Sequence, residues 1–467
     1  MPRRWISRCS PMMPRGSGPE NLIHARCTPP TSSHSTSVRS PPMPRSSDVA
    51  LHLSAGSTRR LDHLPSLRSR GGLQFVFGVW LILSFTGCGE RSISDLAKKS
   101  PSKPTAPEIS WPMTRGGPSL SGNVATTLPR DPVLAWTFAA SGPITAEASL
   151  VAGRVYVGTG KGTLHCLSAD TGQQLWEFPS KDAITAAPAV AAGKVFLASN
   201  DGRLYALSAD TGKEAWQFAS EDKISAGAIV IKAPADSATP GADWILLNGY
   251  DGTTRVLAAD DGKLVWSYKT DDYINGSPAV VDGRFLVFGG CDSQLHVVNL
   301  KDGKLVHKIP TDAQIPASIG TFGTMAFCGN YANQTVAFDV VGGKVAWTYE
   351  DRALPFMSAP AINDRLVLIG SRDKHLHAID RATGRATWTF KTGGRVEGSP
   401  IVFTDGVVFG SADGRLYAAN LADGTELWQL DLGESLVASP SFGGQHMVVG
   451  GEKGTVFALR SRAHPKP

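Results

Sequence analysis

Cysteine is scarce in this chain. There are 6 among 467 residues, and no two are adjacent or have the spacing of zinc ligands. A disulfide framework and a cysteine metal centre are therefore not expected. Cys166 lies in a predicted strand at a position that favours a small apolar residue, and we interpret it as a buried free thiol.

An excess of basic charge is also missing outside the N-terminal region. The formal net charge of +5 comes from 46 basic and 41 acidic residues, but 11 arginines and 3 acids precede Cys88. From Cys88 onward 35 basic and 38 acidic residues remain, which is a net charge of −3. Nucleic-acid binding needs a concentrated basic surface, and no run of Lys or Arg supplies one here. We therefore expect no nucleic-acid partner.

Catalytic and metal-binding motifs are missing as well. The 11 histidines show no His-x-x-x-His or His-Glu-x-x-His spacing and no catalytic-triad context. The alternating Asp and Asn ligands of a calcium loop do not occur, and the recurrent Asp-Gly pairs are interpreted as turn residues. The sequence thus predicts no catalytic, cofactor-binding or metal-binding residue.

Long apolar runs are absent, and the longest, residues 73–85, has about 13 residues. A helix that spans a bilayer needs about 20, whereas the core of a signal peptide needs roughly 7–15. Arg68-Ser69-Arg70 precedes this run and Thr86-Gly87-Cys88 follows it. The arrangement resembles a bacterial lipoprotein signal, although Phe85 replaces the usual Leu. The resemblance implies lipidation of Cys88. The alternatives are an ordinary signal peptide or an anchor helix with an incidental cysteine.

What the chain does contain is a repeat. An aromatic residue, usually four positions after a glycine, recurs every 40 to 50 residues. The positions are Trp136, Trp176, Trp216, Trp266, Trp347, Trp388 and Trp428, with His307 in the remaining one. A fixed period in this range is typical of a propeller or a solenoid, because one unit cannot bury its own apolar face.

Each unit reads as four short strands, of which the innermost is rich in small residues, as in Thr185-Ala186-Ala187-Pro188. The fourth strand carries the aromatic residue, which should wedge between neighbouring blades, with His307 as a weakened wedge. Residues 133–138 form a fourth strand ahead of any inner strand, and the last unit lacks one. We therefore predict an all-β, eight-bladed propeller of four-stranded antiparallel blades, closed by an N-terminal strand that completes the last blade.

The domain organisation follows from these segments. Residues 1–87 are predicted to be a leader and a lipoprotein-type signal peptide, whose start we interpret as over-extended because the leader exceeds any signal requirement. Residues 88–130 are predicted to be the lipidated cysteine and a flexible tether. Residues 131–462 are the propeller, and residues 463–467 are a tail. An insertion at residues 232–241 is expected to form a surface loop.

Residues 205–216, Tyr-Ala-Leu-Ser-Ala-Asp-Thr-Gly-Lys-Glu-Ala-Trp, resemble the tryptophan-docking repeat of the pyrroloquinoline quinone (PQQ) propeller superfamily, as do residues 377–384 with Trp388. Quinoprotein dehydrogenases of that superfamily bind PQQ and calcium and typically stack the cofactor between a tryptophan and a disulfide of adjacent cysteines, which this sequence lacks. BamB-type outer-membrane assembly lipoproteins share the eight blades, a similar length and a lipidated N-terminus. The resemblance implies this second class, without PQQ or calcium.

These features predict a secreted, lipid-anchored and non-enzymatic scaffold that binds protein partners at the cell envelope. Gly89 follows the cysteine in place of the Asp that retains lipoproteins in the inner membrane, which favours the outer membrane. One alternative is a PQQ-dependent dehydrogenase. Another is a sensory or carbohydrate-associated binding module.

Two sets of acidic residues are candidate sites. Turn chemistry does not explain three acid pairs in the loops after fourth strands, and we interpret them as a face for a basic partner: Glu221, Asp222, Asp271, Asp272, Glu350 and Asp351. We call these six residues the rim acids. Glu147 and Glu397 fall in inner-strand positions, where a carboxylate near the channel either binds a cation or is simply solvated.

Overall fold

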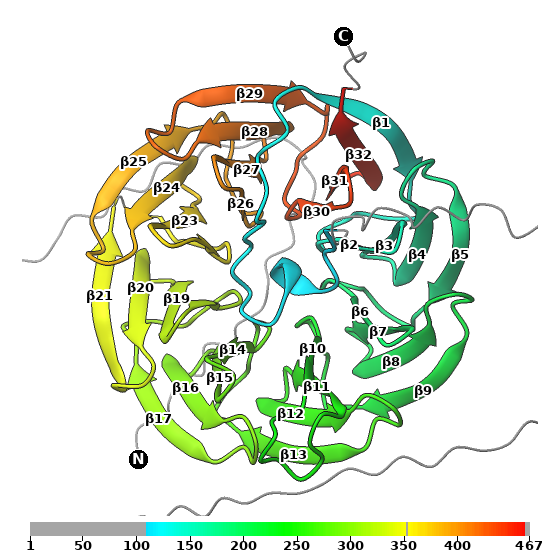
Figure 1. The fold of residues 1–467 in the computed structure, drawn as a ribbon, viewed down its shortest axis with the longest axis vertical. Coiled ribbons are helices and arrows are strands. Elements are labelled where there is room, and N and C mark those ends of the chain that lie inside the picture. The colour runs from blue at the N-terminus through cyan, green and yellow to red at the C-terminus, as the bar shows by residue number, and fades with distance from the viewer. Residues whose placement is uncertain (1–108, 352–353, 463–467) are drawn as a thin grey trace, which may run out of the picture. The chain divides into compact units, whose positions relative to one another are not determined.

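The computed structural model describes residues 109–351 and 354–462. Within them the chain forms eight four-stranded antiparallel sheets arranged as a ring (Figure 1). The predicted all-β, eight-bladed propeller is thereby confirmed. The only helical element among the described residues is a 3-10 turn, η2 (Thr114–Gly116).

We number the blades from the first complete sheet. Blade 1 consists of β2 (Ser149–Val151), β3 (Arg154–Gly158), β4 (Thr163–Ser168) and β5 (Gln174–Pro179). Blade 2 consists of β6 (Ala189–Ala191), β7 (Lys194–Ser199), β8 (Arg203–Ser208) and β9 (Glu214–Ala219). Blade 3 consists of β10 (Ile229–Lys232), β11 (Asp243–Asn248), β12 (Thr253–Ala258) and β13 (Leu264–Lys269). Blade 4 consists of β14 (Ala279–Val281), β15 (Phe285–Gly289), β16 (Gln294–Asn299) and β17 (Leu305–Pro310).

The second half repeats the plan. Blade 5 consists of β18 (Gly320–Phe322), β19 (Met325–Gly329), β20 (Gln334–Asp339) and β21 (Lys344–Glu350). Blade 6 consists of β22 (Ala361–Ile362), β23 (Leu366–Gly370), β24 (His375–Asp380) and β25 (Ala386–Lys391). Blade 7 consists of β26 (Ile401–Val402), β27 (Gly406–Gly410), β28 (Arg415–Asn420) and β29 (Glu426–Asp431). Blade 8 consists of β30 (Ser441–Gly443), β31 (His446–Gly450), β32 (Thr455–Ser461) and β1 (Pro132–Ala139).

The ring closes as the strand count predicts. β1 pairs antiparallel with β32, with Trp136 opposite Ala458, and so supplies the outer strand of the last blade. Both ends of the repeat region thus lie in one sheet, which removes the free edges that an open ring would expose.

The core lies between the blades. The second and third strands of each blade are buried on both faces, whereas the fourth strands alternate between exposed and partly buried residues, as in β9. Side chains such as Phe196 and Trp244 are fully buried. A β-branched and aromatic composition suits such two-sided burial.

At the outer seam, tryptophans join consecutive blades. Six of the seven indoles donate an Nε1–H hydrogen bond of 2.7–3.1 Å to a carbonyl outside their own sheet: Trp136, Trp176, Trp266, Trp347, Trp388 and Trp428. Each ring but that of Trp428 also lies against the turn glycine of the next blade, so that a Cβ on Gly424, for example, would stand 2.5 Å from Trp388. Trp216 packs in the same way against Gly262, but its Nε1 has no partner among the described residues. His307 takes the equivalent place against Gly343.

The inner strands are shorter than the sequence predicts. Residues 185–188 were expected to belong to the inner strand, but β6 begins at Ala189, and the preceding small residues follow an irregular path along the channel. The same displacement recurs in the other blades, because the inner segments converge on the axis and have no strand neighbour there.

The predicted tether is wrong for residues 109–130, which the structure describes as packed into the ring. Within it, residues 109–127, which we call the plug segment, cross the centre of the ring (Figure 1). Trp111 and Leu120 are 1% and 0% exposed, respectively. The plug segment exchanges backbone hydrogen bonds with the inner parts of seven blades, for example Trp111 with Leu150 and Ser121 with Ile362. The plug segment thereby gives hydrogen-bond partners to backbone groups of the inner strands that would otherwise have none.

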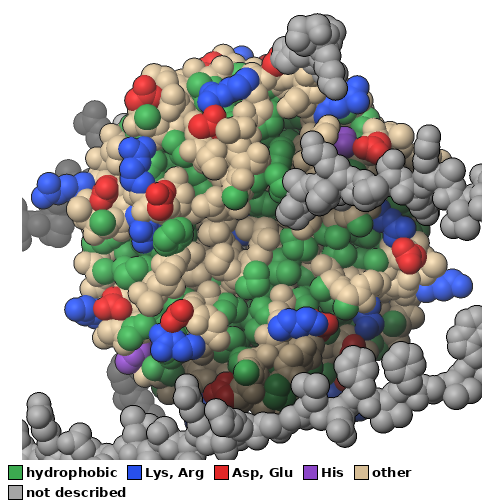
Figure 2. Space-filling model, in the orientation of Figure 1, with side chains coloured by type: hydrophobic (Ala, Val, Ile, Leu, Met, Phe, Trp, Pro, Cys, Tyr) green, Lys and Arg blue, Asp and Glu red, His purple; other side chains and the backbone are tan. Residues whose placement is uncertain are grey.

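The predicted signal peptide, Cys88 and the first part of the predicted tether, up to residue 108, lie outside the described residues, as does the predicted tail at residues 463–467. In the described part of the chain, no helix has the length and apolar character needed to span a bilayer. Charged side chains lie mainly around the periphery of the ring in Figure 2, whereas hydrophobic side chains and backbone surround its centre.

Candidate functional site

One face of the ring is built by two sets of loops. Loops that lead from a fourth strand to the next blade accept hydrogen bonds from the turns between second and third strands, as in Asn200 N–H to Ala183 and Tyr250 N–H to Lys223. The same bond recurs in all eight blades. We call this side the rim face. The turns after first and third strands, including the insertion at residues 232–241, lie on the opposite side because strands in each blade are antiparallel.

At the centre of the rim face is a cavity of about 260 Å³, which we call the cup. Its floor is formed by Thr114 and Arg115 of the plug segment. One ring of side chains lines it near that floor, one from each blade: Glu147, Ala187, Gly227, Ser277, Ser318, Ala359, Ser399 and Ser439. Small residues are needed there because eight chains meet around one axis.

One interpretation of the sequence described Glu147 as a solvated acid, and the structure contradicts it. Its side chain accepts hydrogen bonds from Trp111 Nε1 at 2.6 Å and from the Arg115 backbone N–H at 2.9 Å. The residue is 7% exposed. Burial raises the pKa of Glu147 to about 7, although the charge of Arg115 and both hydrogen bonds act in the opposite direction. The sequence could not show this contact because its donors lie in the segment predicted to be a tether.

Arg115 is the other charged group of the cup floor and is 2% exposed. Its guanidinium donates to the backbone carbonyls of Ser399, Pro360 and Pro400, beneath blades 6 and 7. Burial lowers the pKa of Arg115, and the charge of Glu147 raises it. Arginine nevertheless remains protonated at physiological pH.

Glu397, the second candidate channel acid, lies higher in the wall of the cup. It accepts a 2.7 Å hydrogen bond from Arg372 and lies 3.6 Å from Arg395. Both arginines are partly exposed, at 42% and 54% of their side chains. Both glutamates therefore already have hydrogen-bond donors or arginines as partners, and neither presents an unpaired carboxylate to a cation.

The structure places the six rim acids on the rim face, at the ends of the fourth strands of blades 2, 3 and 5 or in the loops that follow them. Five are exposed and Asp351 is partly exposed. Several also have local partners: Asp222 and Asp272 accept hydrogen bonds from the next backbone N–H, and Asp271 pairs with Lys308 at 3.1 Å. Glu350 accepts from Gln334 at 2.6 Å. Local hydrogen bonds and ion pairs thus explain in part why acidic residues occur at these positions.

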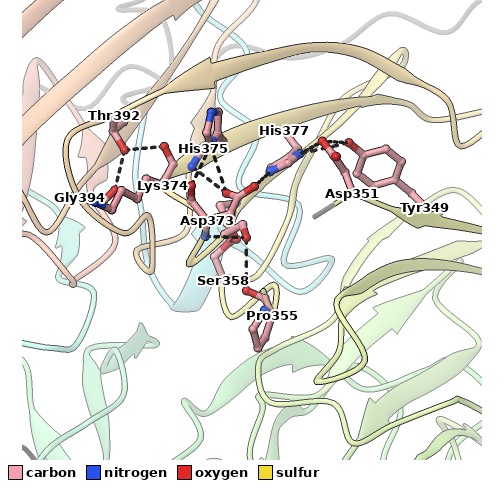
Figure 3. A network of polar contacts seen from close by, with 12 residues as sticks. Tyr349, Asp351, Pro355, Ser358, Asp373, Lys374, His375, His377, Thr392 and Gly394 are labelled. Atoms are coloured by element: carbon pink, nitrogen blue, oxygen red, sulfur yellow. Dashed lines mark hydrogen bonds and ion pairs between the residues drawn. The ribbon is translucent and has the colours of Figure 1, made fainter. Parts of the chain in front are cut away.

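Asp351 adjoins a buried polar network between blades 5 and 6 (Figure 3). His377 lies between Asp373, 3.1 Å from Nε2, and the hydroxyl of Tyr349, 3.1 Å from Nδ1. Asp351 is 3.3 Å from that hydroxyl. Burial raises the pKa of Asp373, but the hydrogen bond from His377 and the charges of His377 and His375 outweigh burial and lower it.

This network is one version of a repeated contact. In five blades an aspartate in the turn before the third strand bonds the side chain four residues later: Asp201–Tyr205, Asp251–Arg255, Asp292–His296, Asp373–His377 and Asp413–Tyr417. Where that residue is His296 or His377, a tyrosine of the preceding blade bonds its other nitrogen. The sequence interpretation treated the Asp-Gly members of this set, Asp201, Asp251 and Asp413, as turn residues alone. Their fixed spacing was the available signal that they also hold the third strand.

The chemistry of the described residues is limited. No group of three or more His, Cys, Asp or Glu side chains in them is placed to hold a metal ion. Neither a tryptophan nor a pair of adjacent cysteines is among the residues that line the cup. The cup therefore lacks the stacking partners that the resemblance to quinoprotein dehydrogenases would require for PQQ. Cys166 is a buried free thiol, which agrees with its interpretation from the sequence, and Cys291 and Cys328 are buried as well.

Comparison with known proteins extends these observations. A family model described as outer membrane protein assembly factor BamB matches residues 121–270, 250–362 and 332–463. The chain belongs to this BamB family. The resemblance stated from the repeat residues is confirmed. No curated protein sequence matches the chain.

Solved structures share the fold at low identity. BamB from Moraxella catarrhalis is 18% identical over 72% of this chain and 99% of its own, with a TM-score of 0.58. Quinohemoprotein alcohol dehydrogenase from Comamonas testosteroni is 15% identical over 77% and 82%, with a TM-score of 0.63. The computationally designed Ika8 protein is 19% identical over 69% and 97%, with a TM-score of 0.60. An outer-membrane protein assembly factor, an alcohol dehydrogenase and a designed protein share this architecture, so the fold does not decide the function.

Proposed function

We propose that this BamB-family propeller is a non-catalytic scaffold that binds a protein partner at the cell envelope, in outer-membrane protein assembly. The observation that carries the proposal is the family match, which extends over the whole described ring. The residues around the cup support it, since they offer neither a metal-ligand cluster nor the stacking partners of PQQ.

The rim acids are the proposed docking face, and the partner carries a basic patch. Glu221, Asp222, Asp271 and Asp272 are exposed on neighbouring loops. Exposed charge of one sign steers a partner of opposite charge and raises the association rate, an effect that salt screens. The plug segment and the tryptophan contacts join the blades that carry these loops.

A charge reversal tests the docking face. The Asp271→Lys, Asp272→Lys variant should capture less partner from detergent-solubilised membranes, while its melting temperature stays near that of the wild type. The matched control is Asp260→Lys, Asp261→Lys, which changes two adjacent acids of the same blade in the turn after β12, on the opposite face. Partner capture that is insensitive to salt and equal in the two variants would place the interface elsewhere, for example at residues 232–241.

The second part of the proposal is the anchor. We propose that the chain is held in the outer membrane by lipid on Cys88, since two or more acyl chains give stable attachment. Cys88→Ala should abolish labelling by a fatty-acid analogue and release the protein from membranes. Cys9→Ala is the control and should change neither. Retention of both label and membrane attachment in Cys88→Ala would refute the lipid anchor.

The dehydrogenase alternative rests on the structural likeness to quinohemoprotein alcohol dehydrogenase. It is tested by adding PQQ and calcium to the purified chain. We expect no quinone absorbance and no dye-linked oxidation of alcohols or sugars. Stoichiometric quinone absorbance with alcohol oxidation would favour the enzyme over the scaffold. The third possibility, a sensory or carbohydrate-associated module, predicts binding of an oligosaccharide instead.

A further inference from the structure

The wall of the cup is chemically uneven. Of the eight equivalent positions that line the cup near its floor, those in blades 4, 5, 7 and 8 are serines, whereas those in blades 2 and 3 are Ala187 and Gly227. Three of these serines accept a hydrogen bond from a backbone N–H at the equivalent position of the preceding blade. The bonds run from Ser277 N–H to Ser318 Oγ, from Ala359 N–H to Ser399 Oγ and from Ser399 N–H to Ser439 Oγ, at 2.9–3.0 Å.

These hydrogen bonds determine what the hydroxyls can offer. A serine hydroxyl has one donor hydrogen besides its acceptor lone pairs. The backbone N–H groups use an acceptor site of Ser318, Ser399 and Ser439, and no protein acceptor is found for the three hydroxyl hydrogens among the described residues. Since all three residues line the cavity, their O–H groups remain available as donors within it.

The floor beneath them has unsatisfied donors of its own. Arg115 is 2% exposed and its Nε has no hydrogen-bond partner among the described residues. The hydroxyl oxygen of Thr114, the other floor residue, has none either. Buried polar atoms in native proteins nearly always have a partner, so these two atoms leave hydrogen-bonding capacity unused in the residues that form the floor.

The charges favour an anion over a cation. Arg115 lies in the floor of the cup, and Arg372 and Arg395 lie beside Glu397 on one side of its wall, so three guanidinium groups stand against the carboxyl groups of Glu147 and Glu397. Glu397 is bound to Arg372, and both oxygens of Glu147 accept hydrogen bonds from the plug segment. Burial also raises the pKa of Glu147 to about 7, which reduces its negative charge near neutral pH. A cation would be repelled by the buried charge of Arg115.

We propose that the cup binds a small oxyanion, either a phosphate or a carboxylate, between Arg115 of the plug segment and the hydroxyls of Ser318, Ser399 and Ser439. Oxyanions accept several hydrogen bonds at once and pair well with guanidinium groups. The volume of about 260 Å³ admits a solute of a few heavy atoms and excludes a folded partner. The partly exposed Arg372 and Arg395 lie on the same side of the mouth and would attract the anion.

Isothermal titration calorimetry on the purified full-length chain in detergent tests this site. The probes are sodium phosphate and sodium malonate at constant ionic strength set with chloride, and glycerol as a neutral comparison. We expect saturable binding of one phosphate or one malonate per chain and no saturable binding of glycerol. Saturation by phosphate alone or malonate alone supports the site and identifies the anion class. No saturable anion binding, or equal binding of glycerol, would overturn the proposal.

Substitutions locate the bound anion. Arg115→Gln should weaken binding by about tenfold or more, because a charge-assisted hydrogen bond is lost. Ser399→Ala and Ser439→Ala should each weaken it by about two- to tenfold. Ser225→Ala is the matched control, a hydroxyl removed from the opposite wall in blade 3, and should leave binding unchanged. If Arg115→Gln prevents folding, the two serine variants decide. Anion binding that both serine variants retain, or that the control loses equally, would refute the site.

Discussion

At the outer edge of the ring each blade is joined to the next by one aromatic side chain, whereas at the inner edge one continuous segment joins seven blades. The outer contacts recur with the period of the repeat, as in Trp347 to Arg381 and Trp388 to Leu421. The inner contacts follow no period, because the plug segment passes each blade at a different residue. Loss of one outer contact should therefore weaken one seam, while loss of the plug segment should affect the whole ring.

Removal of residues 109–125 is the strongest test of this difference. The deletion exposes inner strand edges and removes Trp111 and Leu120, both almost fully buried. Loss of one buried aromatic side chain alone costs about 3–5 kcal/mol, so the deletion should destabilise the protein by more than any single wedge substitution. Thermal melts and light scattering would measure the loss. A variant lacking residues 89–108 serves as the control and should melt like the wild type. Equal melting of both variants would show that the plug segment is dispensable.

Two wedge substitutions compare seams of the outer edge. Trp388→Ala removes a partly buried ring and its hydrogen bond to the Leu421 carbonyl, and should cost about 3 kcal/mol. Trp216→Ala removes a similar ring that has no such bond among the described residues, and should cost about 1 kcal/mol less. Urea denaturation of the two variants measures the difference. A larger loss in Trp216→Ala would show that the hydrogen bond does not set the strength of a seam.

Glu147 allows the inner edge to be tested by pH. The pKa of this carboxyl is raised from 4.5 to about 7 in the folded protein, so between these values the folded state holds a proton that the unfolded state releases. The free energy of unfolding should therefore fall as pH rises from about 4.5 to 7, by at most about 1.4 kcal/mol per pH unit, and level off above.

Urea denaturation at several pH values checks this expectation. Glu147→Gln should lose that part of the slope, because glutamine does not titrate. It should also lose one of the two hydrogen bonds from the plug segment. Glu397→Gln, in the same cup, is the control and should keep the slope. An unchanged slope in Glu147→Gln would assign the pH dependence to another group.

His307→Trp should have the smallest effect. His307 already lies against Gly343, where the other seams place an indole. The larger ring should stabilise this seam by up to about 1 kcal/mol through added buried apolar area. Denaturant melts against the wild type measure the change. A loss of about 1–3 kcal/mol would instead mean that the blades have closed around the smaller ring and that an indole overpacks the gap.

The sequence predicted the parts of the fold that the repeat encodes. Trp136 stood ahead of any inner strand, and this count alone led to the closure of β1 on β32. The acid pairs were also placed correctly on one face, because loop order in an antiparallel blade determines which loops share a side. The spacing from Asp373 to His377 was visible as well, but it was not used in the sequence analysis.

The plug segment could not be predicted in this way. Residues 109–127 have few apolar side chains and no period, which is why they were interpreted as a tether. Their order comes from backbone hydrogen bonds to inner edges that exist only once the ring has formed. The same dependence applies to Glu147, whose partners Trp111 and Arg115 are 36 and 32 residues away in sequence.

By itself, the sequence determined the number of blades, the strand order within each and the side on which each loop lies, because a local repeat specifies local pairing. Only the tertiary structure decided what fills the centre. Eight inner edges meet there, and one aperiodic segment brings Arg115 and Trp111 to Glu147 and forms the floor of the cup. Contacts made by a closed ring with a segment outside the repeat leave no periodic trace in the sequence.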